Sequence, residues 1–367
     1  MRTIIQFFFI LFFFFNFTYA LSQCNFSTIN FLDKINDPKY LKELQVIANN
    51  NKSWTINLLD AYLFSNNKQF IEKKYKKKFN AKVKVIYDFG ECEYNSTIRI
   101  TGDLNDHIYK NKLGNIFPSI KVRLLNGNIL NAVGFKLFLP KAKKNENEVI
   151  TTKILNELNI LSPQTFFIDT KINNLKQKYI FQEEARKELL EKNDRNEGFI
   201  FEGDENYLVN YKGFKNFQLW NISLSRIINK RFAISKGDIN YNNNLRAFTI
   251  LQNVFLKNRY FAESKLDRYF LNFPSEFKKG NKFEIYDLLM ISTNSLHGLI
   301  PHNRKFYFDT INDKFEPIYY DGDTNLNKID PNFIKNNKII LQLINSIDLK
   351  NYNYLQNKIK NLKNEEL

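Results

Sequence analysis

Residues 304–323 of the chain read RKFYFDTINDKFEPIYYDGD. Two segments rich in aromatic residues flank a polar turn, which is the pattern of a β-hairpin. Asn303 stands directly before this hairpin, and Asp321 and Asp323 stand at its end, on either side of Gly322. Because a hairpin brings its two ends together, we expect Asn303 and Asp321 to lie side by side.

Oxygen-bearing side chains at the two ends of one hairpin suit Mg²⁺, which takes one or two carboxylates and leaves its other positions to water and phosphate. Asn303 and Asp321 are the candidate metal ligands, and Asp323 could supply a second carboxylate. Gly322 would let the backbone turn sharply at the metal. The alternative is a polar turn that closes the strand, since Asp and Gly are common turn residues. The spacing alone leaves both interpretations open.

Upstream of the hairpin, the middle of the chain has the period-two pattern of strands, beginning at Ala81 with Val83, Val85 and Tyr87. Asn126-Gly127 is a strong hairpin signal, and Asn173-Asn174 is a second expected turn. The further predicted strands are 96–101, 119–125, 135–140, 164–171 and 177–181.

The apolar residues of several other segments have helical spacing. Residues 37–64 are predicted as two helices, broken at Asn49-Asn50-Asn51. Further helices are expected at 148–159, 183–192, 243–273 (one long helix or a helix pair) and 282–296, with two more within 331–361. The sequence therefore predicts an α+β protein: a helical segment at 21–80, a β-rich lobe at 81–195 and a mainly helical lobe at 196–367 that carries the hairpin.

The first 20 residues resemble a secretory signal peptide, with Arg2, an apolar run from Ile4 to Phe15 and the small residue Ala20. That run is short for a membrane span of about 20 residues. We therefore expect an exported protein, in the periplasm, at the cell surface or secreted. Two other fates stay open: a retained signal anchor, and lipidation of Cys24 in the lipobox-like LSQC (21–24), either of which would attach the protein to the cell envelope.

The chain has two cysteines, Cys24 and Cys92. An oxidising compartment would permit a disulfide between them, and two unpaired thiols are the alternative. Two cysteines cannot build a zinc site without histidine, and His107, His297 and His302 lack ligand-like spacing with them.

The net charge is +16, from 54 Lys and Arg against 38 Asp and Glu. Such a charge invites a nucleic-acid or anionic-surface function. However, Lys and Asn are spread along the whole chain, and zinc-finger, RNP and helix-turn-helix signatures are absent from the sequence. We interpret the densest basic run, KKYKKK (73–78), as a solvated face rather than a nucleic-acid site.

Several short motifs, taken in order, resemble the spore-coat protein CotH kinase family. The resemblance covers about residues 90–327, and it depends on the order of the motifs more than on any one of them. The matching segments are NSTIRITGD (95–103), SIKVRL (119–124), VGFKLFL (133–139), the helix containing Glu148 with LSP (161–163), YIFQE (179–183), NRKFY (303–307) and PIYYD (317–321).

This resemblance implies an atypical protein kinase with a two-lobed kinase-like fold that uses Mg²⁺ and ATP. Asp321 would be the main metal ligand and Asn303 the second. Lys121 would reach the nucleotide phosphates, with Arg99 and Gly102 nearby. The alternative for Lys121 is an outward strand lysine.

Glu183 is the remaining residue that the resemblance assigns to the nucleotide site. It would be a structural or nucleotide-facing acid. The alternative is a carboxylate at a helix N-terminus, stabilised by the helix dipole.

One departure from kinases concerns the catalytic base. Kinases hold an Asp upstream of the metal-binding Asn, whereas the segment 294–303 contains no acid and the nearest upstream is Asp287. His297 stands about where that acid would fall, and an imidazole can act as a general base near neutral pH. Two hypotheses follow: an exported kinase that phosphorylates a hydroxyl of an unidentified protein, or a catalytically inactive binding or assembly module.

Overall fold

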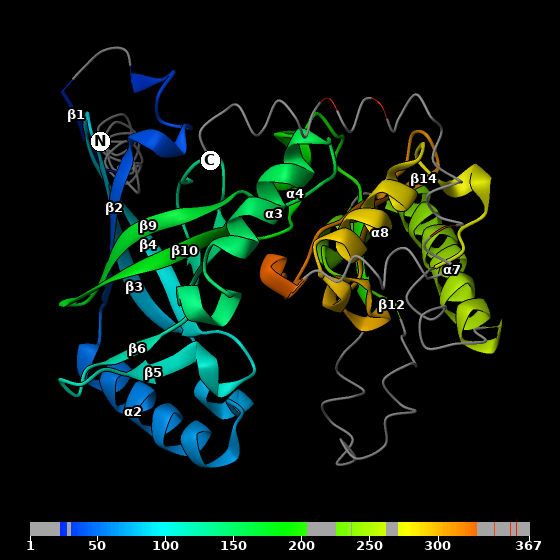
Figure 1. The fold of residues 1–367 in the computed structure, drawn as a ribbon. Helices are drawn as coiled ribbons and strands as arrows, with labels where there is room; N and C mark the ends of the chain where they lie inside the picture. The colour runs from blue at the N-terminus through cyan, green and yellow to red at the C-terminus, as the bar shows by residue number, and fades with distance from the viewer. Residues whose placement is uncertain are drawn as a thin grey trace, which may run out of the picture. The chain divides into compact units, whose positions relative to one another are not determined.

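The computed structural model describes residues 23–27, 31–203, 225–235, 237–261 and 271–328, together with 341, 353 and 357. The chain divides into two compact units (Figure 1). The N-terminal unit comprises Met1–Leu139 and Phe167–Tyr179, and the C-terminal unit comprises Pro140–Phe166 and Ile180–Leu367. The predicted signal peptide and the two helices expected within 331–361 lie outside the described residues, apart from three isolated positions.

The N-terminal half of the chain forms a closed barrel of seven strands. The strands follow the order β4-β3-β2-β9-β10-β8-β7, and pairing of β4 with β7 closes the ring. Strands β2 and β9 pair in parallel. The bounds are β2 Leu41–Ala48, β3 Phe79–Tyr87, β4 Gly90–Ile100, β7 Ile120–Leu124, β8 Gly134–Phe138, β9 Thr165–Ile172 and β10 Leu175–Glu183.

Alternation along the strands builds the core of the barrel, because successive side chains of a strand point to opposite faces. Along β3, Ala81, Val83, Val85 and Tyr87 are buried, while the residues between them are partly or fully exposed. A small hairpin of β5 (Ile108–Lys110) and β6 (Ile116–Pro118) follows β4 in the chain. The period-two pattern read from the sequence therefore located this core correctly.

A short strand, β1 (Gln23–Phe26), pairs with β4 at the edge of the sheet. Cys24 lies opposite Cys92 in this pairing, and the two form a disulfide bond. Of the two states that the sequence left open, the structure shows the paired one.

The first of the two helices expected within 37–64 is wrong, because Leu41–Ala48 is strand β2. A β-bulge between Leu41 and Glu43 shifts the alternation by one residue. As a result, Leu41 and Leu44 are three apart and both buried, which imitates helical spacing. The expected second helix exists as α2 (Asn51–Lys68).

Helix α2 begins where the Asn50 side chain accepts a hydrogen bond from the Ser53 amide (3.0 Å), and it ends at Gln69 in the left-handed conformation. Its inner face buries Trp54, Leu58 and Ala61. The Trp54 ring meets Phe79 of β3 edge-on at 5.3 Å between centroids. This contact anchors the helix to the barrel.

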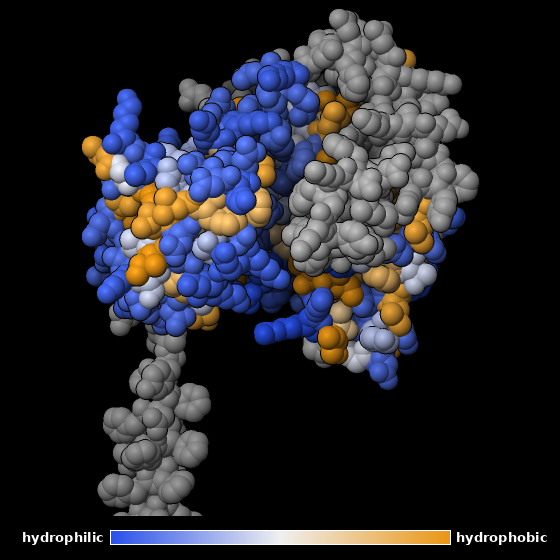
Figure 2. Space-filling model, turned by 90° about the horizontal axis from the view of Figure 1, so that it is seen from below, coloured by the Kyte–Doolittle hydropathy of each residue, from blue (hydrophilic) through white to orange (hydrophobic). Residues whose placement is uncertain are grey.

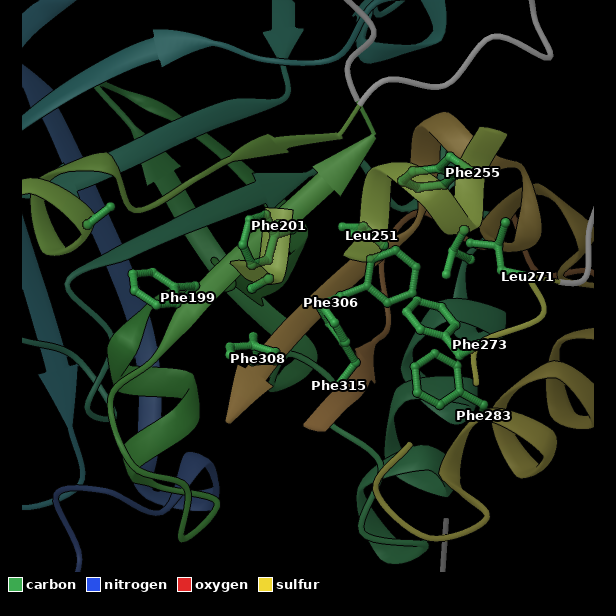
Figure 3. Close-up of a cluster of buried hydrophobic side chains, with 13 residues drawn as sticks. Phe199, Phe201, Leu251, Phe255, Leu271, Phe273, Phe283, Phe306, Phe308 and Phe315 are labelled. Atoms are coloured by element: carbon green, nitrogen blue, oxygen red, sulfur yellow. The ribbon is translucent and has the colours of Figure 1, made fainter. Parts of the chain in front are cut away.

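The C-terminal unit contains a second sheet with the strand order β12-β11-β13-β14. The predicted hairpin is confirmed as β13 and β14, and its strands contribute Phe306, Phe308 and Phe315 to an aromatic core (Figure 3). The strand bounds are β11 Phe199–Gly203, β12 Ser225–Ile227, β13 Lys305–Asp309 and β14 Lys314–Ile318.

Five described helices belong to the C-terminal unit. The expected helices at 148–159 and 282–296 are confirmed as α3 and α8, with shorter or shifted ends. Helix α7 overlaps the expected 243–273, but it begins earlier, at Gly237, and ends at Phe261. Only residues 187–191 of the expected 183–192 are helical. The bounds are α3 Glu146–Glu157, α4 Lys187–Glu191, α6 Lys230–Ser235, α7 Gly237–Phe261 and α8 Lys282–Ser292.

The prediction of an α+β, two-lobed, kinase-like fold is wrong. The chain is mainly β, with a closed seven-stranded barrel in its N-terminal half and only six α-helices within the described residues. The kinase-like fold was inferred from the resemblance of the motifs, together with the order of a β-rich lobe before a helical one. Barrel closure and the second sheet depend on pairings between distant segments, which local patterns do not reveal.

Candidate functional site

The ends of the β13–β14 hairpin meet at one imidazole. His297 lies in the 3₁₀ turn Leu296–Leu299, and its Nδ1 is 2.8 Å from the backbone oxygen of Asp321. The Asn303 Nδ2 lies 3.0 Å from the same Nδ1 and donates to the His297 backbone oxygen at 3.1 Å. The structure thus brings three of the candidate residues together, within the C-terminal unit.

The contact with Asp321 fixes which nitrogen of His297 carries the proton. A backbone oxygen can only accept, so Nδ1 must donate. In the neutral ring Nε2 then carries the lone pair, and it lies 3.2 Å from the Asn303 Nδ2, which can donate to it. Nε2 is therefore the hydrogen-bond acceptor of the ring.

Asp321 and Asp323 both have left-handed backbone conformations, with φ of 47° and 52°. Such angles are uncommon outside glycine, although Asp tolerates them better than most residues. Gly322 between them is closely packed, since a Cβ there would lie 2.6 Å from the Tyr319 hydroxyl. The turn is therefore tightly specified by its surroundings and is more than a solvated loop.

Lys143 is the cation of the site, and the sequence reasoning missed it. It ends the 3₁₀ turn Pro140–Lys143, its side chain is only 8% exposed, and its ammonium forms an ion pair with Asp321 Oδ1. Burial by itself lowers the pKa of Lys143, but attraction to Asp321, Glu148 and Asp323 outweighs it and holds the pKa above its ordinary value. The ammonium is therefore charged at neutral pH.

The neighbouring Lys144 pairs with Asp323 at 2.8 Å, and its side chain is 37% exposed. It also donates to the backbone oxygen of Asp323 at 3.0 Å. Consecutive lysines thus hold the two aspartates of the turn, one pair buried and the other largely solvated.

Glu148, at the start of α3, is a buried carboxylate with two neutral donors. Gln182 Nε2 donates to its Oε1 at 2.8 Å, and the Tyr319 hydroxyl donates to its Oε2 at 2.8 Å. Burial, reinforced by Glu148, raises the pKa of Tyr319 well above its usual range, so the phenol stays protonated. Through these hydrogen bonds Glu148 connects helix α3 to Tyr319, the residue that packs against Gly322.

The base of the site is formed by buried side chains. Tyr319 belongs to an apolar cluster that includes Leu155 of α3, Met290 of α8 and Leu299. Beside it, the hydroxyls of Ser295 and Thr324 lie 2.6 Å apart, so they join the segment before His297 to the segment after Asp323. These contacts fix the position of the Asp321–Asp323 turn relative to the loop that carries His297.

Arg99, Gly102 and Lys121, which the resemblance assigned to the nucleotide phosphates, belong to the N-terminal unit. Arg99 of β4 lies opposite Lys121 of β7 on the barrel. Gly102 has φ of 91°, and the His107 ring occupies the space of its absent side chain. The close approach of His107 explains this glycine.

Glu183 is buried at the end of β10 and not at a helix N-terminus, so the helix-dipole explanation is wrong. It pairs with Lys192 and accepts from the Gln164 amide at 3.2 Å. Burial raises the pKa of Glu183, while Lys192 opposes the shift. Its contacts within the described residues are structural.

Asp287, the nearest acidic residue upstream of the His297 loop, forms an ion pair with Arg304. It is buried on α8 and accepts from Arg304 Nη2 at 2.7 Å. Burial raises the pKa of Asp287 to about 6, against the attraction of Arg304. Because it is enclosed and ion-paired, Asp287 is not placed to accept a proton from a substrate, which leaves His297 as the candidate base.

Across the described part of the chain, no group of three or more His, Cys, Asp or Glu side chains is arranged to hold a metal ion. Mg²⁺ does not need such a group, since it commonly takes one or two carboxylates and fills its shell with water and phosphate. Asp321, Asp323 and the amide oxygen of Asn303 are hard oxygen donors of the right kind.

Comparison with known proteins gives no assignment: no protein-family model matches the chain, and no curated protein matches it. The likeness to the CotH family therefore stays a prediction. None of the helices in the described ranges combines the length and the apolar character needed to cross a bilayer.

Proposed function

We propose that the chain binds a Mg²⁺-nucleotide at the Asp321 site and transfers a phosphoryl group to a hydroxyl of an exported protein. The support is the convergence of Lys143, His297, Asn303 and Asp321 in one unit. The fold, which is not kinase-like, contributes nothing to this proposal.

The donor set fits the proposed ligand. Asp321 and Asp323, with the oxygen of Asn303, would hold the cation. When bound, Mg²⁺ would neutralise negative charge on the nucleotide phosphates. Lys143 supplies a buried positive charge beside Asp321, which suits a phosphate oxygen.

His297 provides the proton acceptor in this proposal. The acceptor hydroxyl forms its new O–P bond while the bond from the phosphoryl group to the departing nucleoside diphosphate breaks, and the hydroxyl proton passes to Nε2 of His297. The hydrogen bond from Nδ1 to the Asp321 backbone keeps the ring oriented for this step.

The proposed export rests on the leader-like N-terminus and on the disulfide. Disulfides persist in oxidising compartments such as the periplasm and the cell exterior. The Cys24–Cys92 bond uses the Cys24 sulfur, so one chain cannot carry both this bond and a thioether-linked lipid on Cys24. We therefore favour a protein without a lipid on Cys24.

A second candidate is a binding module without catalytic activity. It is favoured by the ion pair that already engages Asp321 and by the absence of an Asp or Glu from the loop segment 294–303, where kinases hold their catalytic Asp. This module would use the same site to bind an anionic or hydroxyl-bearing partner.

Phosphoryl transfer from labelled ATP to generic protein acceptors distinguishes these functions. We would compare the wild type with Asp321→Asn, His297→Gln and the control Asp313→Asn. Asp313 is a good control because it also has a left-handed backbone, φ of 57°, and pairs with an arginine.

The enzyme proposal expects Mg²⁺-dependent incorporation in the wild type and in Asp313→Asn, and its loss in Asp321→Asn. In His297→Gln we expect incorporation to fall by about 100-fold or more while nucleotide binding remains, since a general base contributes that much. Nucleotide binding without incorporation in the wild type would favour the binding module. Equal incorporation in all four proteins would overturn the site assignment.

A further inference from the structure

Helix α2 is apolar on two opposite faces. The inner face packs on the barrel through Trp54, Leu58 and Ala61. On the outer face, Ile56, Leu59 and Leu63 follow the i, i+3, i+7 spacing of one helical stripe and are 51%, 45% and 54% exposed. We call these three residues the outer stripe. Exposed apolar residues that line up along one helix face, rather than being scattered singly, mark an interaction surface, so the outer stripe indicates a partner.

Figure 2 views the molecule from the side on which α2 lies in Figure 1, and it shows hydrophobic residues among the hydrophilic ones on the N-terminal unit. Two further exposed apolar residues, Phe70 (47%) and Leu104 (59%), are joined by a β-bridge just beyond the C-terminus of α2. Apolar surface therefore extends past the helix end.

The surroundings of the outer stripe are strongly basic. Residues 51–78 contain seven lysines and two acidic residues, a local net charge of +5. Of the acids, Asp60 lies on the helix and Glu72 pairs with Lys74 at 2.8 Å. The lysines are Lys52, Lys68, Lys73, Lys74, Lys76, Lys77 and Lys78.

The structure attaches this lysine cluster to α2. The turn Lys73–Tyr75 is held to the helix by Asn57, whose Nδ2 donates to the Tyr75 backbone oxygen at 2.9 Å. The Lys74 ammonium lies 4.9 Å from the centre of the Phe64 ring of α2. Lys73, Lys77 and Lys78 are exposed. The lysine turn is thus attached to the flank of α2 that carries Asn57 and Phe64, beside the outer stripe of the same helix.

We propose that this surface docks the protein on an anionic lipid bilayer, with the outer stripe in the headgroup region and the lysines over the lipid charges. An apolar helix face flanked by lysines is the arrangement by which helices lie on membranes. The juxtaposition favours a bilayer over a nucleic acid, because phosphate binding gives no reason to expose Ile56, Leu59 and Leu63. The solvated-face interpretation of residues 73–78 is replaced by this proposal.

Sedimentation of the full chain with lipid vesicles tests the docking. Phosphatidylcholine vesicles are compared with mixed phosphatidylcholine and phosphatidylserine vesicles, at low and high salt. The variants are Ile56→Ser/Leu59→Ser/Leu63→Ser and Lys73→Gln/Lys77→Gln/Lys78→Gln. The matched control is Lys187→Gln/Lys230→Gln/Lys257→Gln, which removes the same charge from exposed positions of the C-terminal unit.

We expect the wild type and the control to bind the anionic vesicles best, and binding to weaken with salt. Each test variant should lose about tenfold or more of this affinity. Because every protein carries the same N-terminal segment, the difference between variants isolates α2. Circular dichroism checks that the variants are folded. Equal binding of control and test variants, or salt-sensitive binding of RNA or DNA without vesicle binding, would overturn the proposal.

A second measurement does not depend on loss of binding. Leu59→Trp should be quenched by brominated lipid in anionic vesicles, whereas Ile311→Trp, at the tip of the β13–β14 hairpin, should not. Quenching at both positions, or at Ile311→Trp alone, would contradict docking through α2.

Discussion

Lys143 and Lys144 are adjacent in sequence but differ in what surrounds them. The ammonium of Lys143 is buried against Asp321, whereas that of Lys144 reaches Asp323 at the solvent boundary. A buried ion pair that loses one partner leaves an uncompensated charge, while an exposed pair is largely replaced by water.

We therefore expect Lys143→Met to lower the free energy of unfolding by roughly 1–3 kcal/mol, at the low end for a buried pair because Asp321 is partly exposed. Lys144→Met should change it by less than about 0.5 kcal/mol. Urea denaturation of both variants measures this difference. Equal effects of the two substitutions would show that the Lys143–Asp321 pair is not buried as described.

At the scale of single residues, the sequence identified Asn303, Asp321 and His297 as candidates, because a hairpin joins its ends. It proposed Lys121 as the cation and missed Lys143. Lys143 lies in a run of lysines, PKAKK (140–144), and nothing local separates a buried lysine from a solvated one. Its burial depends on Asp321, which is 178 residues away in the chain.

Among the elements, the turn after β14 is the one that shapes the candidate site. Gly322 lies where a Cβ would meet the Tyr319 hydroxyl at 2.6 Å and Tyr319 Cε2 at 2.9 Å. Tyr319 cannot move away easily, since it is buried and its hydroxyl donates to Glu148.

Gly322→Ala is accordingly expected to cost about 1–3 kcal/mol of stability, the usual range for overpacking, and to weaken nucleotide binding with it. Adding Tyr319→Phe removes the closest of these contacts, so the double variant should recover part of the loss caused by Gly322→Ala. Thermal unfolding of the single and double variants measures this coupling. Strictly additive effects would mean that the two residues do not touch.

Element prediction succeeded where apolar periodicity was regular. The β13–β14 hairpin and helices α3 and α8 follow their patterns, with ends shifted by a few residues. It failed at β2, where a bulge between Leu41 and Glu43 replaced strand alternation with a helix-like spacing. A single inserted residue was enough to change the predicted element type.

For the whole molecule, local sequence patterns could not predict the fold class. The barrel closes through β4 and β7, and β2 pairs in parallel with β9 from more than a hundred residues away. Neither of these strand pairings can be recognised from the residues of one short sequence segment. The strands of the barrel were mostly foreseen, but their closure was not.

The disulfide bond links strand β1 covalently to strand β4 of the barrel, across a sequence separation of 68. Chain entropy alone gives such a cross-link about 4 kcal/mol. We expect Cys24→Ser/Cys92→Ser, or reduction of the wild type, to lower the free energy of unfolding by about 2–4 kcal/mol. If a reductant leaves the denaturation midpoint of the wild type unchanged, the bond does not contribute to stability.

Calorimetric titration with a non-hydrolysable ATP analogue tests most directly whether Asp321 and its neighbours form a Mg²⁺-nucleotide site. We expect binding in the presence of Mg²⁺, and a loss of about tenfold or more in affinity either on chelation or in Asp321→Asn, as for charged groups that hold a ligand. Asp313→Asn should bind as the wild type does. Absence of binding by the wild type, or unchanged Mg²⁺-dependent binding by Asp321→Asn, would contradict the site assignment.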